Sequence, residues 1–155
     1  MAPVKPIPDG FHTVTPHLIV KGAGKALDFY AQAFGAKEQV RMPAPDGSIM
    51  HAQMQIGDSI VLLADENPEM GNRGPKTLGG TSVVLCIYVD DADALFARAT
   101  KAGATVAMPM ADMFWGDRYG QVTDPFGHLW SIATHKKNPT PDEMKKAMAE
   151  QFAHQ

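Results

Sequence analysis

The sequence predicts an α+β protein built from two pseudo-symmetric β-α-β-β-β halves, because strand-like and helix-like patterns occur twice in the same order. Four pairs of segments match between the halves: Val20 with Val89, Phe34-Gly35-Ala36 with Ala102-Gly103-Ala104, Met42-Pro43 with Met108-Pro109, and Gly57 with Gly127. A repeat of this kind indicates one supersecondary unit that is present twice. We expect a single domain over 1–136, with halves at about 12–66 and 80–136, followed by a helical tail over 137–155.

In the first half, a strand is expected over 13–20, where Pro16 indicates an edge position or an irregular start. Apolar residues at helical spacing predict a helix over 25–34, which Gly35 ends. Further strands are predicted at 38–42, 48–56 and 59–64. The strand over 48–56 alternates between apolar and polar residues, so one side of it is predicted to be polar. A loop rich in Gly, Pro and Asn is expected over 65–80.

The second half repeats the pattern. A strand over 82–89 precedes a helix over 92–102, with Asp90 or Asp91 as its expected N-cap. The later strands are predicted at 105–108, 119–123 and 128–133. In the tail, Thr140-Pro141-Asp142-Glu143 forms a capping-box pattern, which predicts a C-terminal helix to about Phe152.

Composition excludes several classes of protein. Of the 155 residues, 45% are hydrophobic and 20% are charged, and the net charge is −3. Such a chain can bury a core, and it lacks the basic stripe that nucleic-acid binders normally carry. There is no apolar run of the ~20 residues that a membrane helix needs, and no apolar signal segment near Met1. Cys86 is the single cysteine, which excludes an internal disulfide. We expect a cytoplasmic protein with neither nucleic-acid nor membrane partners.

Several motifs together resemble the vicinal oxygen chelate superfamily, which contains glyoxalase I, bleomycin-resistance proteins and extradiol dioxygenases, and within it the PhnB-like branch. The segments that carry the resemblance are Thr15-Pro16-His17-Leu18, Leu27-Asp28-Phe29-Tyr30, Phe34-Gly35-Ala36, Asp46-Gly47-Ser48-Ile49-Met50-His51-Ala52, Trp115-Gly116-Asp117-Arg118-Tyr119-Gly120, Asp124-Pro125-Phe126-Gly127-His128 and Ala133-Thr134-His135. The resemblance implies a glyoxalase/bleomycin resistance fold, in which paired modules form a cupped mixed sheet with the helices outside. It also implies a homodimer, with the ligand inside the cup at or near the subunit interface.

The resemblance also indicates where a metal would be held. In metal-using relatives, four strands each supply a His, Glu or Gln at one inward position. Here those positions are expected at Thr15, Val61, Val84 and Ser131, whose side chains are unsuitable as ligands for Zn, Ni, Mn or Fe. We therefore expect no metal or other cofactor. A set shifted by two residues along the strands, His17, His51 and Cys86, stays open as an alternative.

The strand patterns also suggest polar residues that line a ligand cavity. His17 shares the inward face of its strand, and His51 and Gln53 lie on the polar side of theirs. The repeat is interpreted as placing Gln121 opposite His51 and Thr123 opposite Gln53, and Cys86 opposite His17. The alternatives are a half-buried structural histidine, a solvated polar face and, for Cys86, a small buried residue.

The segment Phe114–Tyr119 is the most informative one for ligand binding. Arg118 is a candidate clamp for a carboxylate or phosphonate, because a guanidinium can donate two parallel hydrogen bonds. Trp115 and Tyr119 are candidates to stack on a flat ligand. The alternative is structural, with Asp117 and Arg118 forming a local ion pair and the aromatic rings closing the sheet edge.

Together these features predict a small-molecule-binding protein without a catalytic metal, which holds a planar or anionic compound in the cup-shaped cavity of a dimer. The expected ligand-binding residues are His17, His51, Gln53, Cys86, Trp115, Arg118, Tyr119 and Gln121. One alternative is a metal-dependent lyase, isomerase or dioxygenase of the glyoxalase-like class. A second is an antibiotic-modifying transferase. No residue pattern identifies a catalytic group.

Overall fold

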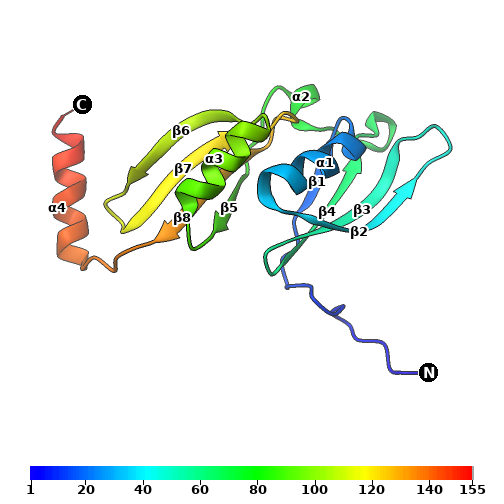
Figure 1. Ribbon diagram of the computed structural model, residues 1–155, viewed down its shortest axis with the longest axis horizontal. Coiled ribbons are helices and arrows are strands. Elements are labelled where there is room, and N and C mark those ends of the chain that lie inside the picture. Colours follow the sequence, from blue (N-terminus) through cyan, green and yellow to red (C-terminus); the bar gives the residue numbers. More distant parts are fainter. Residues whose placement is uncertain (155) are drawn as a thin grey trace.

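The computed structural model describes residues 1–154 and has the two-module architecture that the repeat predicts (Figure 1). Each module contributes one four-stranded mixed sheet, in the orders β1-β4-β3-β2 and β5-β8-β7-β6. The main elements are β1 (His17–Val20), α1 (Ala23–Phe34), β2 (Lys37–Pro43), β3 (Ile49–Ile56), β4 (Ser59–Asp65), α2 (Pro75–Leu78), β5 (Val84–Tyr88), α3 (Ala92–Ala102), β6 (Thr105–Asp112), β7 (Asp117–Thr123), β8 (Leu129–His135) and α4 (Pro141–Phe152). The predicted α+β fold with a C-terminal helix is confirmed.

Several boundaries differ from those expected. β1 begins at His17, because Pro16 lies outside the ladder and contributes only its carbonyl, which accepts from the Leu62 N–H. β6 runs on past Pro109, which an edge strand with register shifts can accommodate. β7 begins at Asp117, so the segment expected to be an aromatic loop belongs partly to a strand. The loop over 65–80 contains a 3₁₀ turn and the short helix α2.

The crossover helices α1 and α3 are anchored in equivalent ways. In the first module, the Asp65 carboxylate at the end of β4 accepts from the N–H groups of Gly22 and Ala23, where α1 begins. In the second module, the Thr134 hydroxyl near the end of β8 accepts from the Ala92 N–H, where α3 begins. Both side chains satisfy backbone donors that a helix N-terminus leaves unpaired.

The two modules are held together along their helices. α1 packs against α3, and the Arg98 guanidinium of α3 donates to the carbonyls of Gln32 (2.6 Å) and Ala31 (3.1 Å) in the last turn of α1. A cation at that end of a helix also interacts favourably with the helix dipole. Figure 1 shows the two sheets side by side, each with its helix on the same side of the molecule.

A buried aromatic cluster fills the seam beneath these helices. Tyr30 and Phe34 of α1 lie 5.5 and 4.8 Å, between ring centroids, from Trp130 of β8. The Tyr30 hydroxyl donates to the buried carboxylate of Asp124 (2.6 Å), which also accepts from the Trp130 indole N–H (2.8 Å). This core therefore crosses the boundary between the two modules.

The C-terminal helix α4 stands apart from the rest of the molecule (Figure 1). The predicted capping box is present, since the Thr140 hydroxyl accepts from the Glu143 N–H and the Glu143 carboxylate accepts from the Thr140 N–H. Within residues 1–154, no other helix or strand packs extensively against it. No helix in that range is long and apolar enough to cross a membrane.

Candidate functional site

Each sheet has one face covered by its helix and one face that is open. The alternating burial of β3 places Ala52 and Met54 under α1, and His51 and Gln53 on the open side. The residues of the first open face include His17, Ile19, Val40, Met42, His51, Gln53, Gln55 and Leu62. Those of the second open face include Cys86, Tyr88, Met108, Asp117, Tyr119, Gln121, Ser131 and Ala133.

The strand pairing corrects the register expected from the repeat. In the first sheet, His17 pairs with Leu62 and Leu62 with Gln53; in the second, Cys86 pairs with Ser131 and Ser131 with Gln121. Gln121 is therefore equivalent to Gln53, and not to His51 as expected. The equivalence of His17 and Cys86 is confirmed.

The same register places Tyr119 at the position equivalent to His51, since each lies two residues before the paired glutamine on its strand. Thr123 is equivalent to Gln55 and not to Gln53 as expected. Val61 also lies on the wrong side for its expected role, because it pairs with buried Met54 on the face that α1 covers. One open face thus has a histidine where the other has a tyrosine.

The first open face is polar. The rings of His17 and His51 lie edge to face with centroids 6.2 Å apart. Partial burial, with an added contribution from His51, lowers the pKa of His17. A chain of amides runs beside them, in which Gln53 donates to Gln39, Gln39 to Gln55 and Gln55 to the Gly57 carbonyl. The structure therefore brings His17, His51 and Gln53 together as a hydrogen-bonding surface.

The second open face is aromatic. Trp115 and Tyr119 contact edge to face, with centroids 5.5 Å apart, and the Gln121 amide donates to the Tyr119 hydroxyl (2.8 Å). These three predicted site residues are thus brought together. Cys86 lies on the edge strand β5 of the same sheet, and its thiol is free and exposed, so the alternative of a buried cysteine is wrong.

Sequence reasoning missed Asp117, the residue that organises this aromatic face. Its side chain is only 3% exposed and accepts hydrogen bonds from Tyr88 Oη (2.8 Å), Trp115 Nε1 (3.0 Å) and His135 Nδ1 (2.7 Å). Strand alternation was the available signal, because Asp117 lies two residues from Tyr119 and shares its face. Two of its three donors, Tyr88 and His135, come from distant parts of the sequence.

The Asp117 contacts shift the protonation of their partners. The hydrogen bond to Asp117 is the main cause that raises the pKa of Tyr88 to about 12. The same carboxylate, followed by the Asn138 side chain, raises the pKa of His135. Burial alone would raise the pKa of Asp117, but the donors His135, Tyr88 and Trp115 outweigh it and hold that pKa below its ordinary value.

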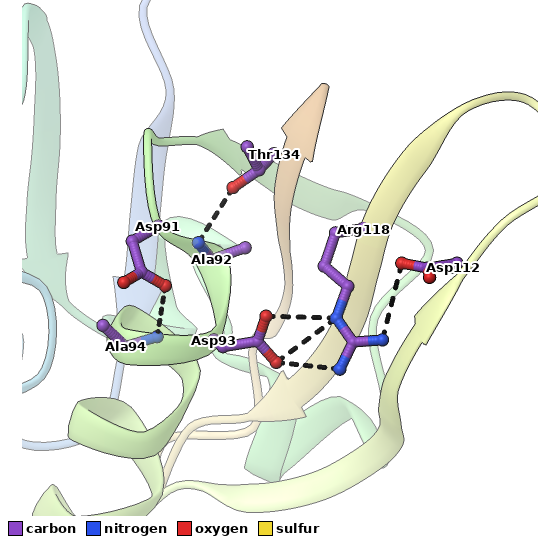
Figure 2. Close-up of polar contacts among 7 residues, drawn as sticks. All are labelled: Asp91, Ala92, Asp93, Ala94, Asp112, Arg118 and Thr134. Atoms are coloured by element: carbon purple, nitrogen blue, oxygen red, sulfur yellow. Dashed lines mark hydrogen bonds and ion pairs between the residues drawn. The ribbon is translucent and has the colours of Figure 1, made fainter. Parts of the chain in front are cut away.

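Arg118 does not join the other predicted site residues. Its guanidinium lies on the helix-covered side of β7, where it pairs with Asp93 of α3 (2.9 Å) and Asp112 of β6 (3.5 Å) (Figure 2). The structural alternative, a local ion pair between Asp117 and Arg118, is also wrong, because neighbouring residues in a strand point to opposite faces. Hydrogen bonding to Arg118 lowers the pKa of Asp93.

Figure 2 also shows how the start of α3 is fixed beside this ion pair. The Asp91 carboxylate accepts from the Ala94 N–H (3.0 Å), which identifies Asp91 rather than Asp90 as the N-cap. Asp93 lies in the first turn of α3, where a negative charge interacts favourably with the helix dipole. Arg118 therefore belongs to the attachment of α3 to the sheet.

The donor atoms present do not fit the four-strand metal site of the superfamily. On the first open face His17 pairs with Leu62, and on the second Cys86 pairs with Ser131. These four positions contain no carboxylate. Within residues 1–154, no group of three or more His, Cys, Asp or Glu side chains is placed to hold an ion. Metal sites need three or four converging ligands, and within one chain the shifted set His17, His51 and Cys86 does not converge.

A cavity of about 620 Å³ lies between the modules, next to the edge strand β5. Its walls are mainly apolar and include Pro16, Phe34, Ile56, Leu85, Ile87 and Trp130. Cys86 and Tyr88 also line it, at the edge of the second open face.

The sequence profile of the Glyoxalase/Bleomycin resistance protein/Dioxygenase superfamily matches residues 10–132, and the chain belongs to this superfamily. The membership that the motifs suggested is thus confirmed. Among individual relatives, the Mycobacterium tuberculosis protein Rv0887c is 46% identical over 141 residues, which span 89% of this chain and 83% of that protein.

Solved structures share the fold. TioX from Micromonospora sp. ML1 superimposes with a TM-score of 0.65 at 32% identity, covering 80% of this chain and 98% of TioX. TnmS3 from Streptomyces sp. CB03234, described as an antibiotic binding protein, superimposes with a TM-score of 0.61 at 26% identity, covering 81% of this chain and 96% of TnmS3.

Proposed function

We propose that this protein binds a planar small molecule against its open sheet faces, in a cavity completed by a second copy of the chain, and that it does so without a catalytic metal. The observation that carries the proposal is the second open face, where the Trp115 ring is exposed yet held by hydrogen bonding and by Tyr119. Aromatic walls with a few fixed polar groups are typical of small-molecule sites.

The similarity to TnmS3 supports the same class of function, since that protein is described as binding an antibiotic. The anionic ligand expected from the sequence loses its support, because the Arg118 guanidinium is engaged by two carboxylates on the other side of the sheet. We therefore keep the planar ligand and do not propose an anionic one.

The proposed dimer follows from the exposure of both open faces. Met42 on the first face and Cys86 and Tyr88 on the second are exposed, although sheet faces of this kind are normally covered. Pairing the polar face of one copy with the aromatic face of another would enclose a ligand between hydrogen-bonding groups and rings. This arrangement is the cup that the superfamily resemblance implied.

A titration with acridone, a neutral, planar and fluorescent tricyclic compound, tests the proposal. We expect the wild-type protein to bind it and Trp115→Ala to weaken binding about tenfold, since loss of a stacked aromatic contact is worth roughly 1–1.5 kcal/mol. Arg118→Ala, on the covered side of the same sheet, is the matched control and should leave the affinity unchanged. Equal affinity in the wild-type protein and Trp115→Ala would remove this face from the site.

Elemental analysis of the same preparation separates the proposal from the metal-dependent alternative. We expect less than about a tenth of an equivalent of zinc, manganese, nickel or iron per chain, because the donor set lacks converging ligands. Close to one equivalent of bound metal, lost together with acridone binding on chelation, would favour the lyase, isomerase or dioxygenase class.

A further inference from the structure

The Asp117 carboxylate is surrounded by aromatic donors from three separate parts of the second sheet. Tyr88 ends β5, Trp115 precedes β7 and His135 ends β8, and each directs its hydrogen-bonding atom at the same buried carboxylate. A buried carboxylate that accepts three hydrogen bonds is satisfied, and it restricts the orientation of every ring that donates to it.

The rings themselves remain accessible. The Tyr88 side chain is 62% exposed and that of Trp115 is 36% exposed, whereas the Asp117 between them is buried. Tyr88 pairs with Ala133 of the central strand β8, and the Tyr88 ring lies over this residue to reach Asp117 on β7. Ala133 is fully buried, and its side chain is only a methyl group, which leaves room for the ring. Rings fixed in advance lose little conformational entropy when a ligand stacks on them, which favours binding.

The electrostatics of this cluster favour a cation. Aromatic faces attract positive charge, and Asp117 places a carboxylate immediately behind them. Among the nearby cationic side chains, Arg118 pairs with Asp93 and Asp112 on the covered side. Lys136 and Lys137 line a small pocket beside Asp117, and neither Tyr88 nor Trp115 lines that pocket.

We propose that Asp117 is a positioning residue that fixes Tyr88, Trp115 and His135 as a preformed platform, and that this platform selects planar cations over planar anions. The inference rests on the proposed function, because it names the charge class of the ligand that the same face would bind. Asp117 acts through the rings and through its field, without itself contacting the ligand.

Three tricyclic probes of similar size and different charge test this inference at pH 8: acridone, the 9-aminoacridinium cation and anthracene-2-carboxylate. We expect the wild-type protein to bind the cation about tenfold more tightly than the anion, in line with a cation–π contribution of roughly 1–2 kcal/mol. Asp117→Asn removes the carboxylate charge behind the rings and should reduce this ratio several-fold. Asp112→Asn is the matched control, because it removes the same charge from the covered side of the same sheet and should leave the ratio unchanged.

Tyr88→Phe keeps the ring and the fold but releases the ring from Asp117, so it tests positioning separately from charge. We expect it to weaken all three probes by a similar factor of about three to five, with the cation-to-anion ratio preserved. This variant also decides the question if Asp117→Asn does not fold, as judged by circular dichroism and thermal melting.

The outcomes separate the two proposals. No binding of any probe by the wild-type protein would refute the proposed function, and this inference with it. Binding of acridone that requires Trp115, together with a cation-to-anion ratio that Asp117→Asn does not change, would overturn the inference alone. Unchanged affinities in Tyr88→Phe would show that Asp117 does not position the platform.

Discussion

Two buried aspartates of the second module have contrasting surroundings. Asp124 accepts from Tyr30 and Trp130, both inside the core, and from the backbone N–H groups of Phe126 and His128. Asp117 accepts instead from rings that are open to solvent. The first carboxylate ties the modules together, whereas the second supports a surface on which a ligand can lie.

His135 gives the Asp117 cluster a pH dependence. Its Nδ1 lies 2.7 Å from Asp117 and its Nε2 2.8 Å from the Asn138 side-chain oxygen, and these contacts raise the pKa of His135 above its ordinary value. A group whose pKa is raised on folding stabilises the protein below its unfolded pKa, and this stabilisation is lost as the pH rises through the folded value.

We therefore expect the wild-type protein to exceed His135→Gln in melting temperature most clearly between about pH 5 and 6.5, with the difference shrinking at higher pH. Paired thermal melts of the two proteins across this range measure the effect. His154→Gln is the control, since His154 lies beyond α4, away from the Asp117 cluster. A difference that grows above pH 7 would contradict the assignment of the raised pKa to the pair.

At the scale of elements, the turn between β6 and β7 depends on Gly116. Its φ is +103°, and its carbonyl accepts from the N–H groups of Lys136 and Lys137 in the segment that follows β8. A Cβ at this position would lie 2.1 Å from the Lys137 carbonyl oxygen. The turn therefore requires glycine both for its backbone conformation and for the close approach of the following segment.

Gly116→Ala should reduce the free energy of unfolding by more than about 3 kcal/mol, because backbone strain and a clash with main chain add together. Gly47→Ala is the matched control, since Gly47 has a φ of +85° but open space around it. It should lose only about 1–2 kcal/mol. Urea unfolding of both variants measures the difference, and equal losses would show that the segment after β8 moves aside freely.

The sequence predicted the helices and strands more accurately than it predicted which residues of the two halves are equivalent. The helix-ending glycines Gly35 and Gly103 are 68 residues apart, and so are Gln53 and Gln121. The turn glycines Gly57 and Gly127 are 70 apart, because the second-module turn is longer, and aligning the halves on that turn shifts the register by two residues. An even shift keeps the faces correct, which is why the polar stripe was placed properly.

Residue roles were harder to predict because they depend on where a strand begins. A strand expected from Tyr119 left Arg118 in a loop, free to point into the site, whereas β7 starts at Asp117 and turns Arg118 to the covered side. Two of the three donors to Asp117, Tyr88 and His135, are 29 and 18 residues away in sequence, and only the sheet brings them to it. No local pattern contains that information.

At the scale of the whole molecule, the proposed pairing of open faces predicts the reactivity of the single thiol. Cys86 is exposed in one chain, and a second copy covering the aromatic face would shield it. We expect Cys86 to react slowly with a thiol reagent at high protein concentration and several-fold faster on dilution, with the change coinciding with dissociation in sedimentation experiments.

The control places a cysteine on α3, as Lys101→Cys in a Cys86→Ser background. This position is exposed on the helix side, so its reactivity should not depend on concentration. A Cys86 rate that is equally independent of concentration, in a protein that sediments as a dimer, would place the contact between copies on a different surface.

The attachment of α1 to α3 has a thermodynamic consequence. Arg98 and the aromatic seam fasten the halves along their helices, so one polypeptide cannot close its own two sheets over a guest molecule. A ligand that is covered on both sides must therefore contact a second copy of the chain, so ligand binding is linked to dimerisation. Bound ligand should then strengthen dimerisation by the same factor by which dimerisation strengthens ligand binding.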